Sequence, residues 1–461
     1  MAVKIPRVKA HEQNAKIRIT NFEEVCLGYS ADDAKTEASR CLNCKNPRCV
    51  NDCPVSIDIP KFILEVAQGD FAAAAETIAQ HSSLPAICGR VCPQEIQCEG
   101  SCIVGIKNEP VSIGKIERFV ADWSRENNLN FLKKTESKVG RVAVVGSGPA
   151  GLSCAYDLAK LGYDITIFEA LHEVGGVLAY GIPEFRLPKQ TVVAHEIDNL
   201  KKMGVKIEPN IIIGRTFTID QLFDDEKFNA VFIGTGAGLP KFMNIAGENL
   251  NGVMSANEFL TRANLMKAFD ENYDTPIYVG KKVVVVGGGN VAMDAARTAL
   301  RLGAEVAVVY RRTEDELPAR NEEIGHAKEE GIIFNLLTNP VEILGDDKGW
   351  VKGIRCIKCC LGEVDSSGRR SPVEVPDSEF DIETDVVIMA LGTSPNPLVA
   401  ATTKGLETNK WQCISVDDDG RTSRAGVFAG GDATTGSASV ILAMGAGRKA
   451  AKAIDEYISS N

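Results

Sequence analysis

Two stretches of this chain repeat one order of apolar and polar positions. In the first, the apolar run Arg141–Val145 is followed by a glycine-rich loop, a helical pattern over Pro149–Leu161 and a second apolar run, Asp164–Phe168. In the second, Lys281–Val286 and Glu305–Val309 stand on either side of another glycine-rich loop and helical pattern. Short apolar runs that alternate with helices are typical of parallel βαβ units with right-handed crossovers. The pattern therefore predicts an α/β protein with two doubly wound domains.

The first 135 residues follow a different pattern, in which helical spacing replaces strand alternation. Ser30–Glu37 has the sequence of a capped helix start. Pro60–Ala79 is rich in alanine and is spaced for one apolar face, with a break near Gly69. The polar stretch Lys133–Lys138 is the expected linker to the first α/β domain. We therefore expect a small α-helical domain over residues 1–135.

The position of the last apolar runs suggests how the two α/β domains are connected. After Ser378 the chain returns to an apolar run, Val386–Leu391, and then to a glycine cluster that ends at Asp432. We interpret this as a return to the first nucleotide-binding domain, which makes the second an insertion. The expected boundaries are 136–272 with 385–461 for the first domain, and 273–384 for the second.

Composition narrows the class of protein. The chain has 461 residues and a net charge of −11, which argues against nucleic acid or an anionic membrane surface as a partner. It contains no run of about 18 apolar residues, so we expect no membrane span. The charged N-terminus does not resemble a secretory signal, and fourteen cysteines without such a signal indicate metal or redox use. We expect the protein in the cytoplasm.

The first glycine loop carries the signature of a dinucleotide site. Its glycines are Gly146, Gly148 and Gly151, with Pro149 and Ala150 between the last two. Glycines in such a loop allow a tight turn and let a pyrophosphate approach the N-terminus of the following helix. Glu169 ends the second strand, about 20 residues further on, where a carboxylate can accept hydrogen bonds from ribose hydroxyl groups. We therefore expect an adenine dinucleotide here.

The second glycine loop differs at the position that distinguishes the two nicotinamide coenzymes. Gly287 and Gly289 are followed by Asn290 and Val291, which open the next helix. The second strand then ends in two arginines, Arg311 and Arg312, where an acid would stand in an NAD(H) site. Guanidinium groups pair with a 2′-phosphate, so the sequence predicts NADP(H). Arg320 is a candidate third contact, although it can equally be an exposed helix residue.

Eight cysteines of the N-terminal region form two groups. The first group has the spacing Cys41-x2-Cys44-x4-Cys49-x3-Cys53, and the second is Cys88-x3-Cys92-x5-Cys98-x3-Cys102. Thiolates bind both iron–sulfur clusters and zinc, so the spacing alone does not decide the metal. Two redox cofactor sites in the same chain favour iron–sulfur clusters, because such clusters pass electrons singly from a flavin. Eight thiols are enough for two all-cysteine [4Fe–4S] clusters.

Several longer motifs together resemble the small-subunit family of glutamate synthase. Relatives of that family include the N-terminal part of dihydropyrimidine dehydrogenase and the NADPH-binding subunit of NADH-dependent reduced ferredoxin:NADP oxidoreductase. The motifs that carry the resemblance are Ala38–Cys44, Ile87–Pro93, Gly175–Pro188, Tyr310–Arg312 and Gly430–Asp432. The resemblance implies a glutathione-reductase-like pair of dinucleotide-binding domains preceded by an α-helical iron–sulfur domain.

The same resemblance implies further site residues. FAD would occupy the first loop, with Gly175 and Gly176 toward the isoalloxazine ring and Asp432 at the ribityl-pyrophosphate region. Arg186 is the candidate catalytic cation near the flavin ring, or otherwise a surface salt-bridge partner. Two further glycines, Gly236 and Gly431, are also expected to contact cofactor.

For the metal, the resemblance replaces the all-cysteine arrangement with a mixed one. One [4Fe–4S] cluster would be held by Cys41, Cys44, Cys49 and Cys102. The other would be held by Cys53, Cys92, Cys98 and a carboxylate, Glu117. Cys88 is then a spare thiol, and whether Glu117 or Cys88 completes the second cluster is left open.

Three functions are compatible with this reading. The preferred hypothesis is the NADPH-side subunit of an electron-bifurcating ferredoxin:NADP oxidoreductase, partnered by ferredoxin and by a smaller FAD/[2Fe–2S] subunit that binds NAD(H). The alternative is the NADPH-oxidising small subunit of glutamate synthase, partnered by its large subunit. Both imply a hetero-oligomer. A third hypothesis, of another class, is a non-catalytic iron–sulfur scaffold or sensor.

Overall fold

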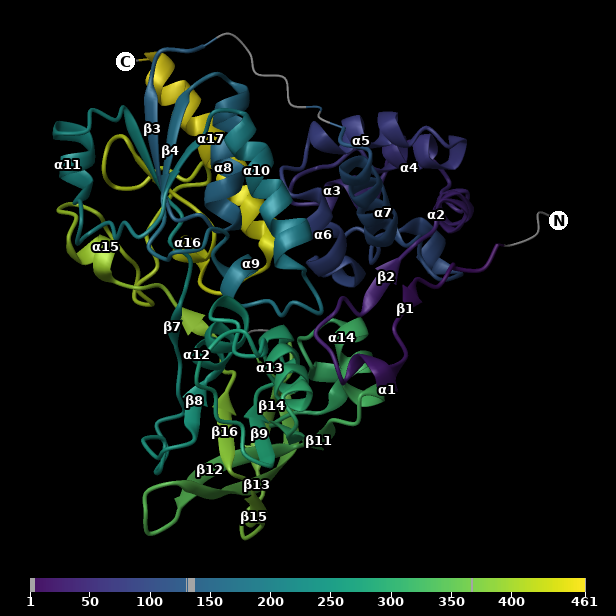
Figure 1. Ribbon diagram of the computed structural model, residues 1–461, viewed down its shortest axis with the longest axis vertical. Coiled ribbons are helices and arrows are strands. Elements are labelled where there is room, and N and C mark those ends of the chain that lie inside the picture. The colour runs from purple at the N-terminus through teal and green to yellow at the C-terminus, as the bar shows by residue number, and fades with distance from the viewer. Residues whose placement is uncertain (1–4, 130, 132–136, 366–367, 461) are drawn as a thin grey trace.

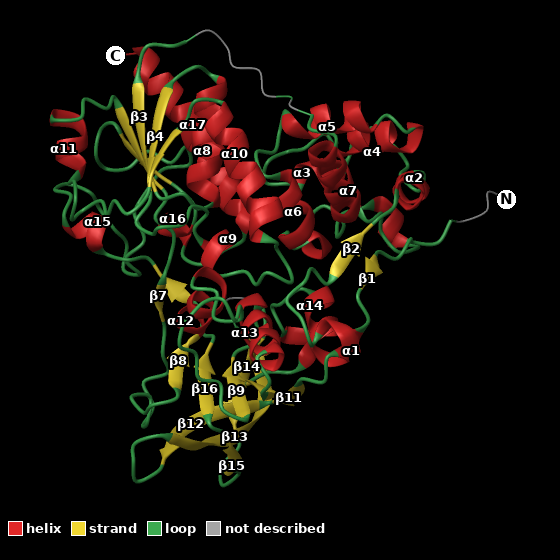
Figure 2. Cartoon of the chain, viewed as in Figure 1, coloured by secondary structure: helices red, strands yellow, loops and turns green. Residues whose placement is uncertain are grey.

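The computed structural model describes residues 5–129, 131, 137–365 and 368–460 of the chain. Figures 1 and 2 show three parts: a helical part beside a first sheet, and below both a second sheet that carries an antiparallel extension. The predicted linker Lys133–Lys138 falls mostly on residues 133–136, which lie outside the described residues. None of the helices in the described ranges has the length and apolar character that a membrane crossing requires.

The N-terminal part is built from short helices, as the sequence predicts. Ser30 caps the first of its packed helices, because its side chain accepts a hydrogen bond from the Asp33 amide and the Asp33 side chain accepts one in return. Gly69, with a φ of +83°, ends the next long helix, and Asp70 caps the one after it. These helices are α2 (Ala31–Ala38), α3 (Arg48–Asn51), α4 (Ile59–Gln68), α5 (Phe71–Ala79), α6 (Pro85–Val91) and α7 (Ile113–Glu126).

One feature of this part was not expected from the sequence. A two-stranded antiparallel ribbon, β1 (His11–Glu12) and β2 (Cys26–Gly28), flanks the short helix α1 (Ala15–Arg18). Figure 1 shows α1 next to α14 (Asn321–Glu329), away from the other N-terminal helices. The N-terminal segment therefore reaches across to the second sheet.

The first sheet is parallel and has the strand order β18-β6-β3-β4-β5. The predicted βαβ unit is confirmed, with strand, helix and strand at the expected positions. The strands and the main helices are β3 (Arg141–Val145), β4 (Asp164–Phe168), β5 (Lys206–Glu208), β6 (Ala230–Ile233), β18 (Val427–Ala429), α8 (Pro149–Lys160), α10 (Ala194–Lys202) and α17 (Val440–Ser460).

The second sheet repeats this arrangement with the order β11-β10-β9-β16-β8, again parallel. Its elements are β8 (Val253–Ser255), β9 (Lys282–Val286), β10 (Glu305–Tyr310), β11 (Ile333–Leu336), β16 (Val386–Met389), α12 (Ala256–Leu260), α13 (Asn290–Arg301) and α14. An antiparallel extension follows, made of β12 (Thr338–Gly345), β13 (Val351–Val364), β14 (Arg370–Glu374) and β15 (Phe380–Glu383).

The expected domain boundaries need one correction. The sequence interpretation assigned Val253–Ser255 and Val386–Leu391 to the first α/β domain, but Val387 pairs with Val253 and with Val284 in the second sheet. The return to the first sheet comes only with β18. A short run of apolar residues is compatible with either buried sheet, so only the pairing partner decides its place.

Short elements make the remaining connections. An antiparallel pair, β7 (Leu239–Pro240) and β17 (Thr393–Ser394), lies where the chain passes between the two sheets. The other helical segments are α9 (Val177–Tyr180), α11 (Ile219–Asp224), α15 (Leu398–Ala401), α16 (Asp432–Thr435), three 3₁₀ turns at Gln94–Ile96, Ile103–Ile106 and Glu314–Glu316, and two π-helical turns at Lys189–Val193 and Thr261–Leu265.

Candidate functional site

The three glycines of the first loop have three different physical roles. Gly146 has a φ of +99°, and a Cβ there would lie 2.6 Å from the carbonyl oxygen of Gly234. A Cβ on Gly151 would lie 2.0 Å from the carbonyl oxygen of Gly146, so this residue lets α8 approach the loop. A Cβ on Gly148 would meet no atom within 4 Å. The open face at Gly148, next to Pro149 and the start of α8, is where a phosphate group can approach the backbone.

Glu169 lies beside this loop, as predicted. Its Oε2 accepts hydrogen bonds from the Ser147 amide at 2.9 Å and the Ser147 hydroxyl at 2.5 Å, and its Oε1 accepts one from the Leu171 amide at 2.8 Å. A carboxylate has about four acceptor positions, so capacity for a ribose hydroxyl remains. Ser147, which the motif leaves unspecified, was missed by the sequence analysis although it orients this carboxylate.

Segments that are distant in the sequence meet at the first loop. A Cβ on Gly176 would lie 2.9 Å from the Cα of Gly148, and the Gly175 amide donates to the Ser147 hydroxyl at 2.9 Å. A Cβ on Gly431 would lie 2.8 Å from the Cβ of Ala150. These contacts bring the predicted cofactor residues of three segments together.

The structure also gives the positions of two other residues predicted for the first site, Asp432 and Gly236. Asp432 follows Gly431 directly and opens α16, and burial raises the pKa of its carboxyl group to about 6. Gly236 has a φ of +69° in the loop after β6, and a Cβ there would meet nothing within 4 Å.

The second loop has the same construction. A Cβ on Gly287 would lie 2.4 Å from the carbonyl oxygen of Ala390, while the nearest atom to a Cβ on Gly289 would be 4.0 Å away. The loop opens α13 at Asn290, and Val291 is 42% exposed there. Gly288 was missed by the sequence analysis, although a Cβ on it would lie 2.6 Å from Leu317; the run of three consecutive glycines was the available signal.

The two adjacent arginines after β10 have different environments. Arg311 is exposed and makes no hydrogen bond or ion pair with any residue in the described ranges. Arg312 is only 4% exposed; its Nε donates to the carbonyl oxygen of Arg370 at 2.7 Å and its Nη2 pairs with Asp365 Oδ2 at 2.6 Å. The expectation that both arginines bind a 2′-phosphate is therefore wrong for Arg312, which anchors the β13–β14 hairpin. Arg311 remains the candidate.

Arg320 also differs from its prediction. Its amide donates to the side chain of Asn290 at 3.0 Å, so its backbone does lie at the second loop. Its guanidinium group points elsewhere, and donates to the Arg90 carbonyl oxygen at 2.8 Å and to Gln94 Oε1 at 3.1 Å. Since the side chain is buried against the helical part, it is neither a third phosphate contact nor an exposed helix residue.

Arg186 was expected near the flavin ring or at the surface; the structure contradicts the surface position, and the place near the flavin ring stays a prediction. Its Nη1 binds both carboxylate oxygens of Asp294, at 2.7 and 2.6 Å, and its Nε lies 3.0 Å from Glu323 Oε1. The side chain is 6% exposed. Arg186 is thus held in a buried ion pair with helices α13 and α14 of the second sheet.

The first group of predicted metal ligands comes together in one cavity. Its walls include all four thiols, with apolar side chains such as Leu42, Ile63 and Ile103 around them; the four are Cys41, Cys44, Cys49 and Cys102. Burial, and the neighbouring thiols Cys102 and Cys41, raise the pKa of Cys49 to about 12. No cation compensates these thiols among the described residues that line the cavity, apart from Arg48 at its edge. Clustered thiols in an apolar cavity fit an iron–sulfur group, which supplies the missing positive charge.

The second group is more deeply buried. The pKa values of Cys53 and Cys98 are raised by burial and by the nearby Glu117 and Cys92. Glu117 Oε1 is buried and has no hydrogen-bond partner among the residues that the structure describes, and burial raises the pKa of this carboxyl group to about 8. An orphaned buried carboxylate oxygen among thiols requires an explanation, and ligation of a metal provides one. The residues present therefore fit the predicted second cluster.

Cys88 lies in the same group. Its hydrogen bond with the Cys92 thiol, followed by burial, raises its pKa, and its Sγ is 3.4 Å from Met444 Sδ. Cys88 thus contacts the side chain of Met444, whereas Glu117 Oε1 has no hydrogen-bond partner among the described residues. This difference agrees with the expectation that Cys88 is a spare thiol and not a cluster ligand. No disulfide joins any of the cysteines, all of which lie in the described ranges.

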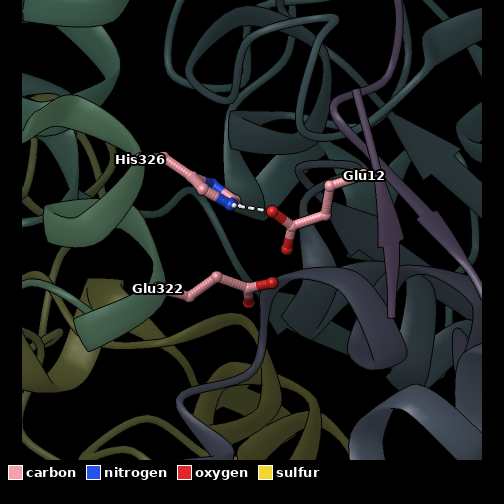
Figure 3. A group of neighbouring side chains, drawn as sticks. All are labelled: Glu12, Glu322 and His326. Atoms are coloured by element: carbon pink, nitrogen blue, oxygen red, sulfur yellow. Dashed lines mark hydrogen bonds and ion pairs between the residues drawn. The ribbon is translucent and has the colours of Figure 1, made fainter. Parts of the chain in front are cut away.

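A third cluster of possible metal ligands was not predicted. Figure 3 shows Glu12, Glu322 and His326, whose ligand atoms lie within 4.8 Å of one another. His326 Nε2 is 3.1 Å from Glu12 Oε2, but Glu322 is already paired with Lys115 and with Arg320. Two cations on one carboxylate disfavour a further cation. We interpret this cluster as a contact between the N-terminal segment and α14.

Comparison with known protein families agrees with this architecture. The family model for dihydropyrimidine dehydrogenase domain II, 4Fe-4S cluster, matches residues 18–129, and the model for pyridine nucleotide-disulphide oxidoreductase matches residues 140–450. A solved structure of Mycobacterium tuberculosis FprA in complex with NADPH is similar in fold, with a TM-score of 0.58 and 18% sequence identity over 70% of this chain and 85% of that one. The chain is thus an oxidoreductase with an N-terminal 4Fe–4S domain.

Full-length relatives define the family more closely. The glutamate synthase [NADPH] small chain of Halomonas elongata is 37% identical over 470 residues, which cover 99% of this chain and 97% of that protein. The small chain of Escherichia coli (strain K12) is 36% identical over 468 residues, covering 99% and 98%. On this evidence, the chain belongs to the glutamate synthase small-chain family.

Proposed function

We propose that this chain is the NADPH-oxidising subunit of a glutamate synthase-type complex, with FAD at the first loop, NADPH at the second and two [4Fe–4S] clusters in the helical part. The observation that carries the proposal is the presence of two open glycine loops and two groups of clustered thiols in one chain. When bound, these groups supply hydride acceptance and one-electron transfer.

The residues of the chain have distinct tasks in this proposal. Gly148 and the start of α8 receive the flavin pyrophosphate, and Glu169 receives its ribose. Gly289 and the start of α13 receive the coenzyme pyrophosphate, and Arg311 is the residue with a free guanidinium group for the 2′-phosphate. We also infer three units: residues 1–135, then the first α/β unit, and a second α/β unit that begins near Val253 and ends near Met389.

The identity of the partner is inferred from the relatives. The alignments cover nearly all of two proteins named as small chains, which supports a large partner subunit and a hetero-oligomer. The ferredoxin:NADP oxidoreductase hypothesis, with ferredoxin and a smaller NAD(H)-binding subunit, has no comparable observation in its favour. The scaffold hypothesis is disfavoured because both loops keep their open glycine positions. A cytoplasmic location remains a prediction.

The test is anaerobic purification from the native cells, with two measurements. We expect NADPH to bleach the visible flavin absorbance faster than NADH does, and mass spectrometry to identify a large amidotransferase subunit. Copurification of a small flavin and iron–sulfur subunit would favour the ferredoxin:NADP oxidoreductase instead. A protein whose flavin does not respond to NADPH would contradict both and revive the scaffold.

A further inference from the structure

Arg186 lies between the two glycine loops: the chain segment before it contacts the first loop, and its side chain contacts the helix that follows the second. The chain segment that precedes it packs on the first loop, since Gly176 approaches the Cα of Gly148. On the other side, a single nitrogen of Arg186, Nη1, contacts both carboxylate oxygens of Asp294, at 2.7 and 2.6 Å. Asp294 lies one turn into α13, the helix that the second loop opens at Asn290.

The residues around this ion pair reinforce the connection. Glu323 of α14 lies 3.0 Å from Arg186 Nε and also pairs with Arg297 of α13. The ring of Phe185, which is fully buried, lies under two guanidinium groups of α13, with 4.8 Å to Arg297 and 4.0 Å to Arg301. Phe185 and Arg186 are therefore both docked on α13.

An ion pair is an unusual choice for such a buried contact if stability is its only role. Removing two charges from water costs several kcal/mol per ion, and apolar residues of similar volume often stabilise a core as well or better. What the planar guanidinium group adds is a fixed distance and a fixed angle, because Nη1 contacts Asp294 of α13 while Nε faces Glu323 of α14. Fixed geometry matters for hydride transfer, in which the reacting atoms must approach to about 3–3.5 Å and a 1 Å misplacement costs on the order of 100-fold in rate.

We propose that Arg186 is a positioning residue for hydride transfer, which holds the helix of the NADPH loop in register with the segment packed on the flavin loop. The hydride step in this inference rests on the proposed function. Arg186 is not required to touch either cofactor, so its effect is on geometry and not on binding.

The first test is stopped-flow reduction of the bound flavin by NADPH in the intact protein. For Arg186→Ala and for Asp294→Asn we expect the limiting rate to fall about 100-fold, while the NADPH concentration for half the limiting rate changes less than about threefold. Arg186→Lys keeps the charge but has one nitrogen in place of the two that face Asp294 and Glu323, and we expect it to recover part of the rate. Reduction by dithionite, which needs no docking, should be unchanged in all three.

The matched control is Arg355→Ala. Arg355 of β13 pairs with Asp381 of β15 and Glu342 of β12 in the separate antiparallel sheet, but its side chain is 40% exposed. We expect its flavin reduction by NADPH to equal that of the wild type. Equal losses in Arg355→Ala and Arg186→Ala, or a loss in Arg186→Ala confined to the NADPH concentration dependence, would overturn the positioning role.

Hydrogen–deuterium exchange gives a second readout that needs no turnover. Arg186→Ala should increase exchange in α13 and in residues 182–187, and leave α8 unchanged. If the wild-type flavin does not respond to NADPH, the proposed function fails, and the exchange pattern still decides whether Arg186 holds the two segments. Unchanged exchange in α13 would contradict the inference whatever the activity.

Discussion

At the scale of single residues, neighbours in the sequence acquire separate roles through their surroundings. Arg311 and Arg312 follow the same strand, yet one is exposed and the other is paired with Asp365. The difference lies in their contacts after the end of β10: the side chain of Arg312 is held at the β13–β14 hairpin by Arg370 and Asp365.

We predict that Arg311→Ala raises the apparent KM for NADPH by about 10- to 100-fold, since a lost charge-assisted pair with phosphate is worth about 1.4–2.8 kcal/mol. The KM for NADH should change less than about twofold, because NADH has no 2′-phosphate. Steady-state kinetics with both coenzymes provides the measurement. Arg312→Ala is the control: it should lower the thermal stability and leave the ratio of the two KM values unchanged.

The two candidates for the last ligand of the second cluster can be separated by iron content. We predict that Cys88→Ala keeps about eight iron atoms per chain, whereas Glu117→Ala loses about four, because the orphaned carboxylate is the group without another partner. Iron analysis and electron paramagnetic resonance of the reduced protein would check this. The reverse result would make Cys88 the ligand.

At the scale of elements, each dinucleotide loop separates the glycine that the fold needs from the glycine that the ligand needs. Gly151 is required by the packing of α8 on the Gly146 carbonyl group, whereas Gly148 faces open space. The second loop repeats the division with Gly287 and Gly289. Within the six residues Gly146–Gly151, the first loop therefore contains one glycine that helix packing requires and one that leaves room for a ligand.

Alanine substitutions should distinguish these two requirements. Gly151→Ala places a Cβ 2.0 Å from a backbone oxygen, so we predict a lower melting temperature and poor recovery of folded protein. Gly148→Ala has room in the protein and an ordinary φ of −69°, so it should fold but retain much less flavin after gel filtration. Gly325→Ala in α14, which also has open space, is the control and should keep its flavin. Full flavin occupancy in Gly148→Ala would argue against phosphate binding at this loop.

At the scale of the whole molecule, buried ion pairs and a buried hydrogen bond attach the N-terminal part to the second sheet. Arg18 of the N-terminal segment is 2% exposed and binds Glu330 Oε1 at 2.8 Å, near the end of α14. Glu330 in turn binds Arg297 and Arg301 of α13. Arg320 adds a hydrogen bond from its guanidinium group to the carbonyl oxygen of Arg90 in the helical part. The iron–sulfur part is therefore attached to the second sheet at more than one point.

We predict that Arg18→Ala destabilises the protein by about 1.5–3 kcal/mol, because it removes a charge-assisted hydrogen bond while Glu330 keeps Arg297 and Arg301 as partners. Lys16→Ala is the control on the same short helix; Lys16 is exposed, so its effect should stay within about 0.5 kcal/mol. Chemical denaturation of the loaded protein would measure both. An equal, small effect in both variants would show that the N-terminal segment contributes little to holding α14.

The same charges predict how stability depends on pH. Burial alone would raise the pKa of Glu330, but its hydrogen bonds with Arg301 and Arg297 and their charges lower it to about 2, from an ordinary value of 4.5. A carboxylate with a lowered pKa stabilises the fold fully above pH 4.5, and this contribution is lost as the pH falls toward 2. We therefore expect the melting temperature to drop steeply below pH 4.5, and less steeply in Arg301→Ala, which removes one of the two arginines that lower this pKa. A parallel decline in the two proteins would contradict this origin.

The amino-acid sequence by itself determined the features that depend on neighbouring residues. The capped start of α2, the break at Gly69 and the two strand–loop–helix–strand units follow from local propensity and periodicity, and the structure confirms all of them. The glycine spacing also identified the two loops, because the turn and the helix start that it requires lie within a few residues.

Only the tertiary structure decided the partners of residues far apart in the chain. It put Val386–Met389 into the second sheet, Arg186 against Asp294, and Arg320 against the helical part. An apolar run can pair in either sheet, and an arginine can pair with whichever carboxylate the fold brings near it, so local pattern leaves such choices open. The physical reason is that these contacts depend on how whole domains are placed relative to one another, and that placement is set by the sum of many packed surfaces.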